Sequence, residues 1–415
     1  MTAHRKQRIA YVNHTGKVSG AEKILLSMLR GLDRTRFEPV VLCPAEGNLR
    51  QMVEAEGIPC AFVPTLNARF TWRPGELLRY MVSVFRVMLA MRDQIARANP
   101  DFVHANSVRA GIVATLATIG TSRPVVWHVH DNLPRHPLSG VIRLLAYASK
   151  RTRIVAVSRA TAEAFSGSVP FKDRIQVIHN GIDLSRFPLK GGKAPLKDEL
   201  GISQRGFLVC AVGQICYRKG LRDLLEAFSQ IYDDAPEVHL AIVGKPVFPH
   251  EEAYRDELVA MAIAAGIADR AHFAGERNDI SAVMQSTDLL VLNSLEEPFG
   301  LVLVEAMSCG TPVLATRVGG IPEIVTDRES GWLIDRGDTS ALASKLLELS
   351  RDPASLDRVA QFARESVCPR FSIERFLADL HMFYERLSKL PCTEQIVQAP
   401  VVFAGLHDPQ GDQHV

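Results

Sequence analysis

Residues 294–320 read SLEEPFGLVLVEAMSCGTPVLATRVGG, and the fold prediction starts from this stretch. Its apolar run predicts a helix that starts near Pro298 and ends at Gly310, because proline is common in the first turn of a helix and glycine just after the last. The segment TPVLATRV follows, and it is short, apolar and β-branched, as buried parallel strands are. A helix that leads directly into such a strand is typical of an α/β domain.

The same alternation continues on both sides of this stretch. Strand-like runs in the first half are RIAYVNH, EPVVLCP, DFVHANS, PVVWHVHD, TRIVAVS and IQVIHNGID. Those in the second half are FLVCAVGQI, VHLAIVGK, AHFAGE, DLLVLNS and TPVLATRV, with amphipathic segments such as RDLLEAFSQIYDD between them. Two such series predict two doubly wound parallel sheets, whose ligands bind beyond the carboxyl ends of the strands. We therefore expect an α/β protein with its active site between two domains.

Composition places the expected boundaries. Residues 1–185 form a first domain, and residues 186–200, rich in Gly, Pro and Lys, form a linker. Residues 201–368 form a second domain, followed at 369–390 by an amphipathic helix that we expect to pack back on the first. Residues 391–415 mix Pro, Gln, Asp and His without periodicity, which predicts a disordered tail.

The overall composition, 47% apolar and 23% charged, is that of a soluble globular protein. No uncharged run is long enough for a spanning helix, and residues 1–10 carry His, Arg and Lys where a signal peptide needs an apolar segment. We therefore expect a cytoplasmic protein. Its seven cysteines are scattered and form no CxxC pair, so neither a disulfide framework nor a zinc site is indicated.

Charge is divided unevenly along the chain. Residues 1–183 hold 25 of the 48 Lys and Arg but only 13 of the 46 Asp and Glu, so the two parts carry net charges of +12 and −10. This asymmetry indicates an anionic partner for the first domain, such as a membrane surface, a lipid-linked acceptor or an acidic polymer. Alternatively, the basic domain only complements its acidic neighbour.

Residues 76–98 form a basic amphipathic segment that bears on the same question. Four arginines, Arg79, Arg86, Arg92 and Arg97, stand among large apolar residues. Such a helix either lies on an anionic membrane, here the inner face of the cell membrane, or packs its apolar face into the domain core. Nucleic acid is not expected as a partner, because the chain has no compact Lys/Arg tract and no base-stacking motif.

Two glutamates flank the apolar run of the opening stretch. Glu297 and Glu305 are separated by seven residues, which would place Glu297 at the mouth of a helix and Glu305 about 12 Å further inside. The free N–H groups of Phe299, Gly300 and Leu301 at that mouth can face an anion, and sugar or ribose hydroxyls can satisfy the carboxylates. Alternatively, Glu297 only stabilises the helix start and Glu305 caps a neighbouring loop.

The stretch EPFGLVLVEAM, with GGIPE at 319–323, resembles glycosyltransferase family 4, whose members are retaining enzymes of the GT-B fold. The resemblance extends to SGAEKIL, WHVHD, AVSRATAEAF, IHNGID, VGQICYRKG and GERNDISAVMQSTDLLVLNS, and so covers nearly all of residues 8–388. It implies two Rossmann-like domains facing across a cleft, the first on the acceptor side and the second binding a nucleotide sugar. The implied reaction moves a hexose or N-acetylhexosamine from a UDP- or GDP-sugar to an acceptor hydroxyl on a glycan or lipid-linked molecule, in the synthesis of a cell-surface glycan or glycolipid.

The resemblance also implies roles for individual residues. Glu297 would hold hydroxyls of the donor sugar, and Glu305 would hold the ribose hydroxyls. Lys219 matches the lysine that contacts the donor diphosphate, where it would stabilise the charge of the leaving group. His130 aligns with the histidine that meets the donor sugar or the acceptor. His128 points the same way along the strand, so the assignment between the two remains open.

Two positions depart from the family pattern. Gln214 follows Gly213 where an arginine is common, and Arg218 is a candidate to supply the missing charge. Ser19 replaces the first of two paired glycines, while Gly20 remains in a loop that can approach the donor phosphate or sugar.

Neither a metal ion nor a cofactor is expected, because the sequence has no DxD triplet and no zinc-ligand spacing. Two alternatives stay open. One is a nucleotide-sugar epimerase of the same fold. The other is a noncatalytic nucleotide-sugar binder, in which the departures at Ser19 and Gln214 mark lost turnover.

Overall fold

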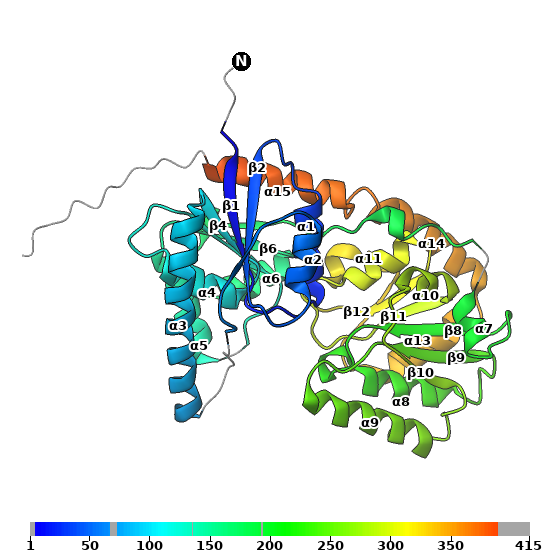
Figure 1. The fold of residues 1–415 in the computed structure, drawn as a ribbon. Helices are drawn as coiled ribbons and strands as arrows, with labels where there is room; N and C mark the ends of the chain where they lie inside the picture. The colour runs from blue at the N-terminus through cyan, green and yellow to red at the C-terminus, as the bar shows by residue number, and fades with distance from the viewer. Residues whose placement is uncertain (1–4, 67–72, 135, 192–193, 389–415) are drawn as a thin grey trace, which may run out of the picture.

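The computed structural model describes residues 5–66, 73–134, 136–191 and 194–388. The described chain contains two parallel β-sheets, each with helices on both faces (Figure 1). The prediction of two doubly wound α/β sheets is therefore confirmed. The tail expected at 391–415 lies outside the described residues.

The first sheet has the order β3-β2-β1-β4-β5-β6-β7, and its six neighbouring pairs are parallel. Its strands are β1 (Gln7–Val12), β2 (Phe37–Cys43), β3 (Cys60–Phe62), β4 (Phe102–Ala105), β5 (Val125–Val129), β6 (Thr152–Ala156) and β7 (Ile175–Val177). One face packs against α1 (Gly20–Arg30), α2 (Leu49–Ala55) and the last helix, α15 (Ile373–Ser388). The other face packs against α3 (Pro74–Ala98), α4 (Val108–Ala117), α5 (Pro137–Ala148) and α6 (Arg159–Ser166).

The second sheet has the order β10-β9-β8-β11-β12-β13 and is also parallel. Its strands are β8 (Phe207–Val212), β9 (Val238–Val243), β10 (Ala271–Gly275), β11 (Leu289–Leu292), β12 (Val313–Thr316) and β13 (Trp332–Ile334). One face packs against α8 (Leu221–Ile231), α9 (Pro249–Ala264) and α13 (Thr339–Ser350). The other packs against α7 (Pro195–Glu199), α10 (Ile280–Ser286), α11 (Leu301–Ser308), α12 (Ile321–Ile324) and α14 (Pro353–Val367). In both sheets the first strand lies in the interior, so the strand order reverses beside it and leaves a crevice at the carboxyl ends.

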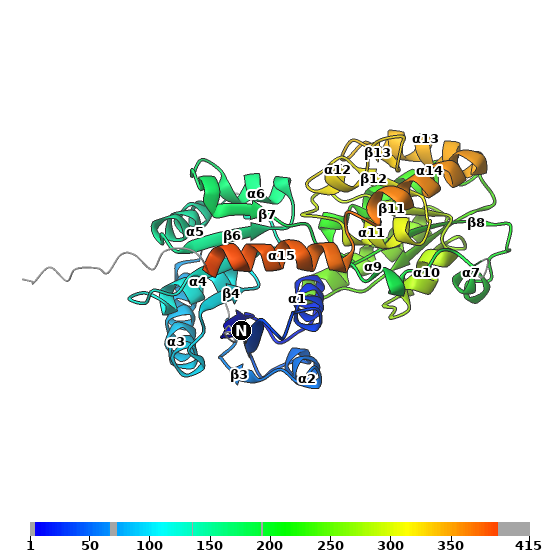
Figure 2. The ribbon, with the colours of Figure 1, turned by 90° about the horizontal axis from the view of Figure 1, so that it is seen from above.

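The chain crosses between the domains twice, and the two crossings lie side by side. The N–H of Ile182 donates to Phe371 O (2.9 Å), and the N–H of Ile373 donates to Ile182 O (2.8 Å). From this point α15 runs back across the first domain (Figure 2), where Leu380 and Tyr384 enter its core.

Part of the stretch 186–200 is helical rather than open linker. Leu196 of α7 is buried in the core of the second domain, and Lys197 of the same helix pairs with Asp288 at 2.6 Å. Within the described parts of the chain we find no helix that combines the length and the apolar character needed to cross a bilayer.

The contact between Gly111 and Trp127 gives a test of the first domain's packing. A Cβ at Gly111 in α4 would lie 2.3 Å from the indole ring, which is buried and held through Nε1 by Thr115 (2.9 Å). We expect Gly111→Ala to lower the free energy of unfolding by about 1–3 kcal/mol, because a packed core cannot make room for a methyl group.

Gly140→Ala is the matched control, since Gly140 also lies in a helix but no atom lies within 4 Å of its Cβ position. It should be neutral or stabilising by up to about 1 kcal/mol. Urea unfolding followed by circular dichroism measures both variants, and equal stabilities would contradict the packing argument.

Candidate active site

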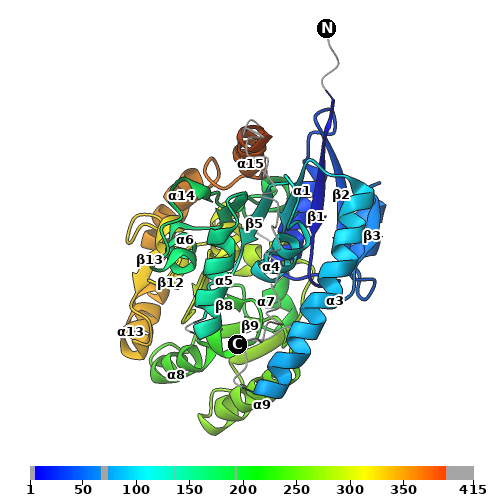
Figure 3. The ribbon, with the colours of Figure 1, turned by 90° about the vertical axis from the view of Figure 1, so that its left-hand side faces the viewer.

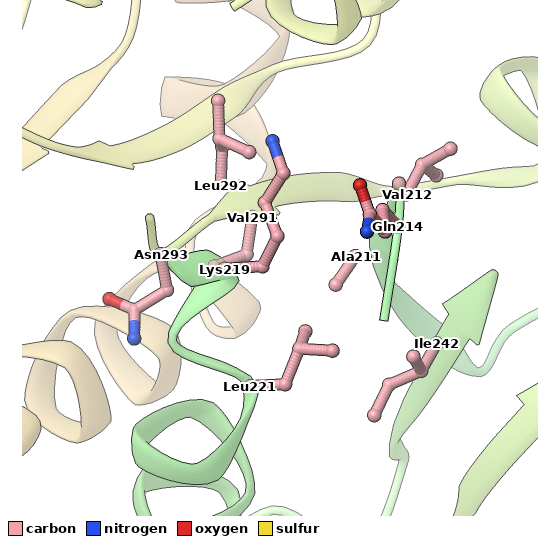
Figure 4. A pocket seen from close by; sticks show the side chains of 10 residues that line it. Ala211, Val212, Gln214, Lys219, Leu221, Ile242, Val291, Leu292 and Asn293 are labelled. Carbon is pink, nitrogen blue, oxygen red and sulfur yellow. The ribbon is translucent and has the colours of Figure 1, made fainter. Parts of the chain in front are cut away.

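A pocket opens at the carboxyl ends of β8 and β11 (Figure 4). The lining residues are Ala211, Val212, Gly213, Gln214, Lys219, Leu221, Ile242, Val291, Leu292 and Asn293. Three residues predicted from the sequence, Gly213, Gln214 and Lys219, therefore lie together. Their position is the crevice at which doubly wound sheets bind ligands.

Lys219 and Glu297 form an ion pair beside this pocket. Lys219 Nζ lies 2.6 Å from Glu297 Oε2, although the two residues are 78 positions apart in the sequence. Ser294 Oγ donates to the same carboxylate oxygen at 3.0 Å. Both charged side chains are mostly shielded, with exposures of 21% for Lys219 and 11% for Glu297. The site thus contains an ammonium group and a carboxylate in direct contact.

Helix α11 begins later than the sequence predicted. Its first residue is Leu301 instead of Pro298, so Glu297 lies in the loop before the helix. Gly300 precedes the helix with a φ of +108°, a conformation that favours glycine. Phe299 is 3% exposed and packs its ring against His179 and Phe371, with centroid distances of 5.7 and 5.6 Å. The start predicted at Pro298 was wrong, because these tertiary contacts hold residues 297–300 out of the helix.

Two glycines support the backbone of this loop. A Cβ at Gly319 would lie 1.9 Å from Glu297 O, and one at Gly320 would lie 2.5 Å from Pro298 O. The N–H of Gly320 donates to Glu297 O at 3.0 Å. The GGIPE stretch therefore positions the loop by a close backbone approach that only glycine permits.

The first domain holds the same loop from the opposite side. Pro298 O accepts hydrogen bonds from Ser158 Oγ (2.6 Å) and Thr161 Oγ1 (3.2 Å), at the start of α6. The loop that carries Glu297 is consequently fixed by both domains.

Glu323 adds a second interdomain contact that the sequence analysis did not assign. Its carboxylate accepts from the N–H groups of Arg159 and Ala160 (3.0 and 3.1 Å) and from His179 Nε2 (2.8 Å). Burial alone would raise the pKa of Glu323, but these hydrogen bonds outweigh it and lower the pKa. The only sequence signal was an acidic residue after the glycine pair, whose partners lie more than 140 residues away.

Glu305 lies in the second turn of α11 and is half-buried. Its carboxylate has no hydrogen-bond partner among the described residues. Burial raises the pKa of Glu305 to about 7, although the positive charges of Lys23 and Arg186 oppose the shift. An acceptor without a protein donor is suited to a ligand that brings hydroxyl groups.

On the first-domain side, His130 belongs to a chain of polar contacts. His130 Nε2 lies 3.1 Å from Asn106 Oδ1, Asn106 Nδ2 donates to Asn13 Oδ1 (3.1 Å), and Asn13 Nδ2 donates to Glu22 Oε1 (3.1 Å). Since an amide oxygen only accepts, Nε2 of His130 carries the proton. Burial lowers the pKa of His130 to about 3, so the ring is neutral and its Nδ1 remains an acceptor.

The same chain fixes the start of α1, whose first residue is Gly20 instead of a loop residue as the sequence predicted. Glu22 accepts from the N–H of Ser19 (3.0 Å) and from Ser19 Oγ (2.5 Å), so Ser19 takes part in a capping box at the start of α1. Gly20 has open space where a Cβ would lie. The replacement of a glycine by Ser19 is therefore structurally accommodated.

The structure distinguishes His128 from His130. His128 is fully buried, and its Nδ1 lies 3.3 Å from Nε2 of His104, whose Nδ1 lies 2.8 Å from the Tyr384 hydroxyl of α15. His130 is half-buried. Of the two histidines, His130 is the one that a ligand can reach.

Gln214 and Arg218 have different interaction partners. Gln214 Nε2 donates to both oxygens of Glu251 (2.6 and 2.8 Å), so its amide is held toward α9. Arg218 is exposed, and its charge acts across the cleft on Asp131 of the first domain. Burial raises the pKa of Asp131, and Arg218 opposes that shift.

Among the described residues, no group of three or more His, Cys, Asp or Glu side chains is arranged as metal ligands would be. Metal-free activity stays a prediction.

Comparison with known families covers both domains. The model described as Glycosyltransferase Family 4 matches residues 18–186, and the model described as Glycosyl transferases group 1 matches residues 193–366. This chain belongs to glycosyltransferase family 4. The resemblance seen in EPFGLVLVEAM and GGIPE is thereby confirmed.

Individual relatives agree with the family assignment. N-acetyl-alpha-D-glucosaminyl L-malate synthase of Bacillus anthracis is 29% identical over 302 residues, which are 71% of this chain and 77% of that enzyme. UDP-Gal:alpha-D-GlcNAc-diphosphoundecaprenol alpha-1,3-galactosyltransferase of Escherichia coli is 26% identical over 385 residues, 90% of this chain and 95% of that enzyme. The solved Anabaena protein Alr3699/HepE, in complex with UDP and glucose, has a TM-score of 0.77 and 28% identity, and the match covers 92% of this chain and 100% of that one. The GT-B fold is confirmed.

The raised pKa of Glu305 predicts a pH-dependent stability in this family 4 protein. The folded state binds a proton at Glu305 with a pKa of about 7, against 4.5 for the ordinary side chain. Protonation of Glu305 therefore contributes to the free energy of unfolding below pH 4.5, and this contribution is lost as the pH rises to 7. Glu305→Gln cannot ionise. Its stability relative to wild type should rise by about 2–3 kcal/mol between pH 5 and pH 8.

Urea unfolding of both proteins at several pH values measures the difference. Glu365→Gln, at an exposed position on α14, serves as the control and should show no such trend. A pH-independent difference for Glu305→Gln would mean that the carboxyl group is not desolvated.

A second prediction concerns the interdomain contact of Glu323. Glu323→Ala leaves two N–H groups of α6 and one histidine without their acceptor, so we expect the free energy of unfolding to fall by about 1.5–3 kcal/mol. Glu365→Ala, which loses an exposed hydrogen bond to Gln361 (3.1 Å), should cost less than about 0.5 kcal/mol. Thermal unfolding compares the two, and equal shifts would show that the contact is not stabilising.

Proposed function

We propose that this family 4 protein transfers a hexose or N-acetylhexosamine from a UDP-sugar to an acceptor hydroxyl with retention of anomeric configuration. The contact between Lys219 and Glu297 at the pocket is the observation that carries the proposal. The Anabaena neighbour, solved with UDP and glucose and also with UDP-glucose, supports a UDP-linked donor. GDP-sugars are the other donors to be tested.

The ion pair suggests how the two residues share the donor. Both hydrogen bonds that described residues donate to the Glu297 carboxylate reach Oε2, which leaves Oε1 to accept a sugar hydroxyl. Lys219 lies beside it and would stabilise the negative charge that grows on the diphosphate as the glycosidic bond breaks. Arg218 would add charge at the same cleft, because Gln214 supplies none.

The remaining residues would hold other parts of the donor. Glu305 would accept hydrogen bonds from the ribose hydroxyls, and the N–H groups at Gly300 and Leu301 would face the phosphates. Gly20 and Gly213 would allow the backbone to approach the donor closely. Neutral His130 would accept a hydrogen bond from a hydroxyl group through Nδ1, without taking its proton. Phe299 would serve by fixing the loop, since its ring is buried.

In the proposed reaction the bond between C1 of the sugar and the phosphate oxygen breaks, and its electron pair stays with the nucleotide diphosphate. The acceptor oxygen attacks C1 from the same face, and its proton passes to the leaving phosphate oxygen. Domain closure would orient the two substrates. We propose that Lys219, Arg218 and the start of α11 meet the phosphate charge without a metal ion.

The Escherichia coli relative is named for an acceptor linked to diphosphoundecaprenol. On this basis we propose a glycan or lipid-linked acceptor, in cell-surface glycan or glycolipid synthesis at the cytoplasmic side of the membrane.

Nucleotide diphosphate release tests the proposal. Purified protein is incubated with a panel of UDP- and GDP-sugars in EDTA. We expect slow release from one donor, reduced at least 100-fold in Glu297→Ala and Lys219→Ala, because each loses a group that acts on the transition state. Lys345→Ala removes an ion pair on α13, outside the site, and should leave the rate unchanged.

Two other results would assign another function. An altered sugar still attached to the nucleotide would show an epimerase. Equally tight donor binding in all variants with no release would show a noncatalytic binder.

A further inference from the structure

Exposed apolar side chains gather on one side of the first domain. Among the described residues, 17 large apolar side chains are exposed, and nine of them lie on or beside α3, α4 and α5, with exposures of 40–63%. We call these nine the α3–α5 face. Its members are Leu78, Met81, Val82, Phe85 and Leu89 of α3, Ile119 after α4, and Val141, Leu144 and Tyr147 of α5. Single exposed apolar residues are ordinary, but a cluster of this size marks an interaction surface.

The arrangement of the helices explains why this face stays uncovered. Helix α4 packs between α3 and α5, and all three helices lie on the same side of the sheet (Figure 3). The buried residues of α3 are Val87, Met91 and Ile95, all in its C-terminal half, so residues 74–86 contribute none. Figure 1 shows this N-terminal part of α3 extending beyond the rest of the domain. The sequence left open whether the apolar residues of α3 belong to the core, and the structure assigns only part of them to it.

The charges on these helices are mainly positive. Residues 73–98 contain five arginines and two acidic residues, and α5 contains one arginine and no acidic residue. Asp93 is paired with Arg97 at 2.9 Å. Arg79 and Arg86 are exposed and form no ion pair among the described residues. Two unpaired arginines beside exposed apolar residues match a surface that is both anionic and apolar.

We propose that the α3–α5 face docks on the surface of an anionic phospholipid bilayer. The apolar side chains enter the boundary between headgroups and acyl chains, while Arg79 and Arg86 bind lipid phosphates. Tyr147 suits the same boundary, because its ring is apolar and its hydroxyl is polar. The opposite charge of the lipids favours a bilayer over a second copy of this chain, whose same face is basic as well.

This inference is independent of the proposed reaction, because none of these residues belongs to the candidate active site. If the acceptor is lipid-linked, docking through α3 and α5 holds the first domain at the surface where that acceptor lies. The inference concerns the partner of the face and not the chemistry of the cleft.

Vesicle sedimentation tests the proposal with the full-length protein. Vesicles of phosphatidylcholine with phosphatidylglycerol are compared with vesicles of phosphatidylcholine alone, at low and high salt. We expect binding to the anionic vesicles that weakens with salt, because exposed charges are screened. Phe85→Ser/Leu144→Ser and Arg79→Glu/Arg86→Glu should each weaken binding by at least about tenfold.

Matched controls lie on the second domain. Ile263→Ser/Phe362→Ser replaces two apolar residues of similar exposure, and Arg205→Glu/Arg358→Glu replaces two exposed arginines. Both should bind vesicles as the wild type does. Thermal unfolding of every variant checks that the fold is intact, so a loss of binding is not confused with unfolding.

Several outcomes would overturn the proposal: no binding to anionic vesicles, equal binding to both vesicle types, or equal losses in face and control variants. A change of oligomeric state in light scattering, abolished by the α3 and α5 substitutions without any vesicle binding, would instead identify the face as a contact between copies. Because vesicle binding needs no donor, these results are distinct from a failure of the nucleotide release experiment.

Discussion

The candidate site depends on how the backbone of residues 297–299 is held. Within its own domain, this loop lies against Gly319 and Gly320, which approach its carbonyl groups more closely than any other residue could. From the first domain, Ser158 and Thr161 donate to Pro298 O. A loop fixed from both sides places the carboxylate of Glu297 within 2.6 Å of Lys219. Any change in the relative position of the domains therefore acts on this carboxylate, which links the domain arrangement to the geometry of the site.

The first domain supplies the site with a chain of buried polar side chains. Asn13, Asn106 and Glu22 are buried and hydrogen-bonded to one another in a chain that ends at His130. Buried polar groups tolerate few alternative arrangements, because each lost hydrogen bond costs free energy. Behind this chain, Tyr384 of α15 contacts His104, so the C-terminal helix supports the histidines of the first domain from within. Positive charge acts on the site from both domains: from Lys219 and Arg218 of the second domain, and from Lys23 and Arg109 of the first, which act on Glu305 and Asp131.

Much of the fold followed from local patterns. Buried strands such as β5 and β8 are continuous apolar runs, and these were predicted near their observed positions. Of the three-residue edge strands, β7 lies in the predicted run IQVIHNGID, but β3 and β13 were not predicted, because three residues by themselves are too few to show a pattern. The start of α11 was misplaced for a different reason: Phe299 and Pro298 satisfy contacts with the other domain, which outweigh the helical preference of the apolar run.

The fold class, the family and the residue types of the site could all be predicted from the chain's own residues, because periodicity and motif spacing are local properties. The interaction partners of these site residues could be read only from the tertiary structure. It paired Lys219 with Glu297, tied Gln214 to Glu251 and joined Glu323 to α6. Among the residues that the structure describes, it left Glu305 without a hydrogen-bond donor. It also showed that the first half of α3 contributes no buried residue to the core. Hydrogen bonds, ion pairs and burial depend on distances between residues far apart in the chain, and these distances exist only once both sheets have packed.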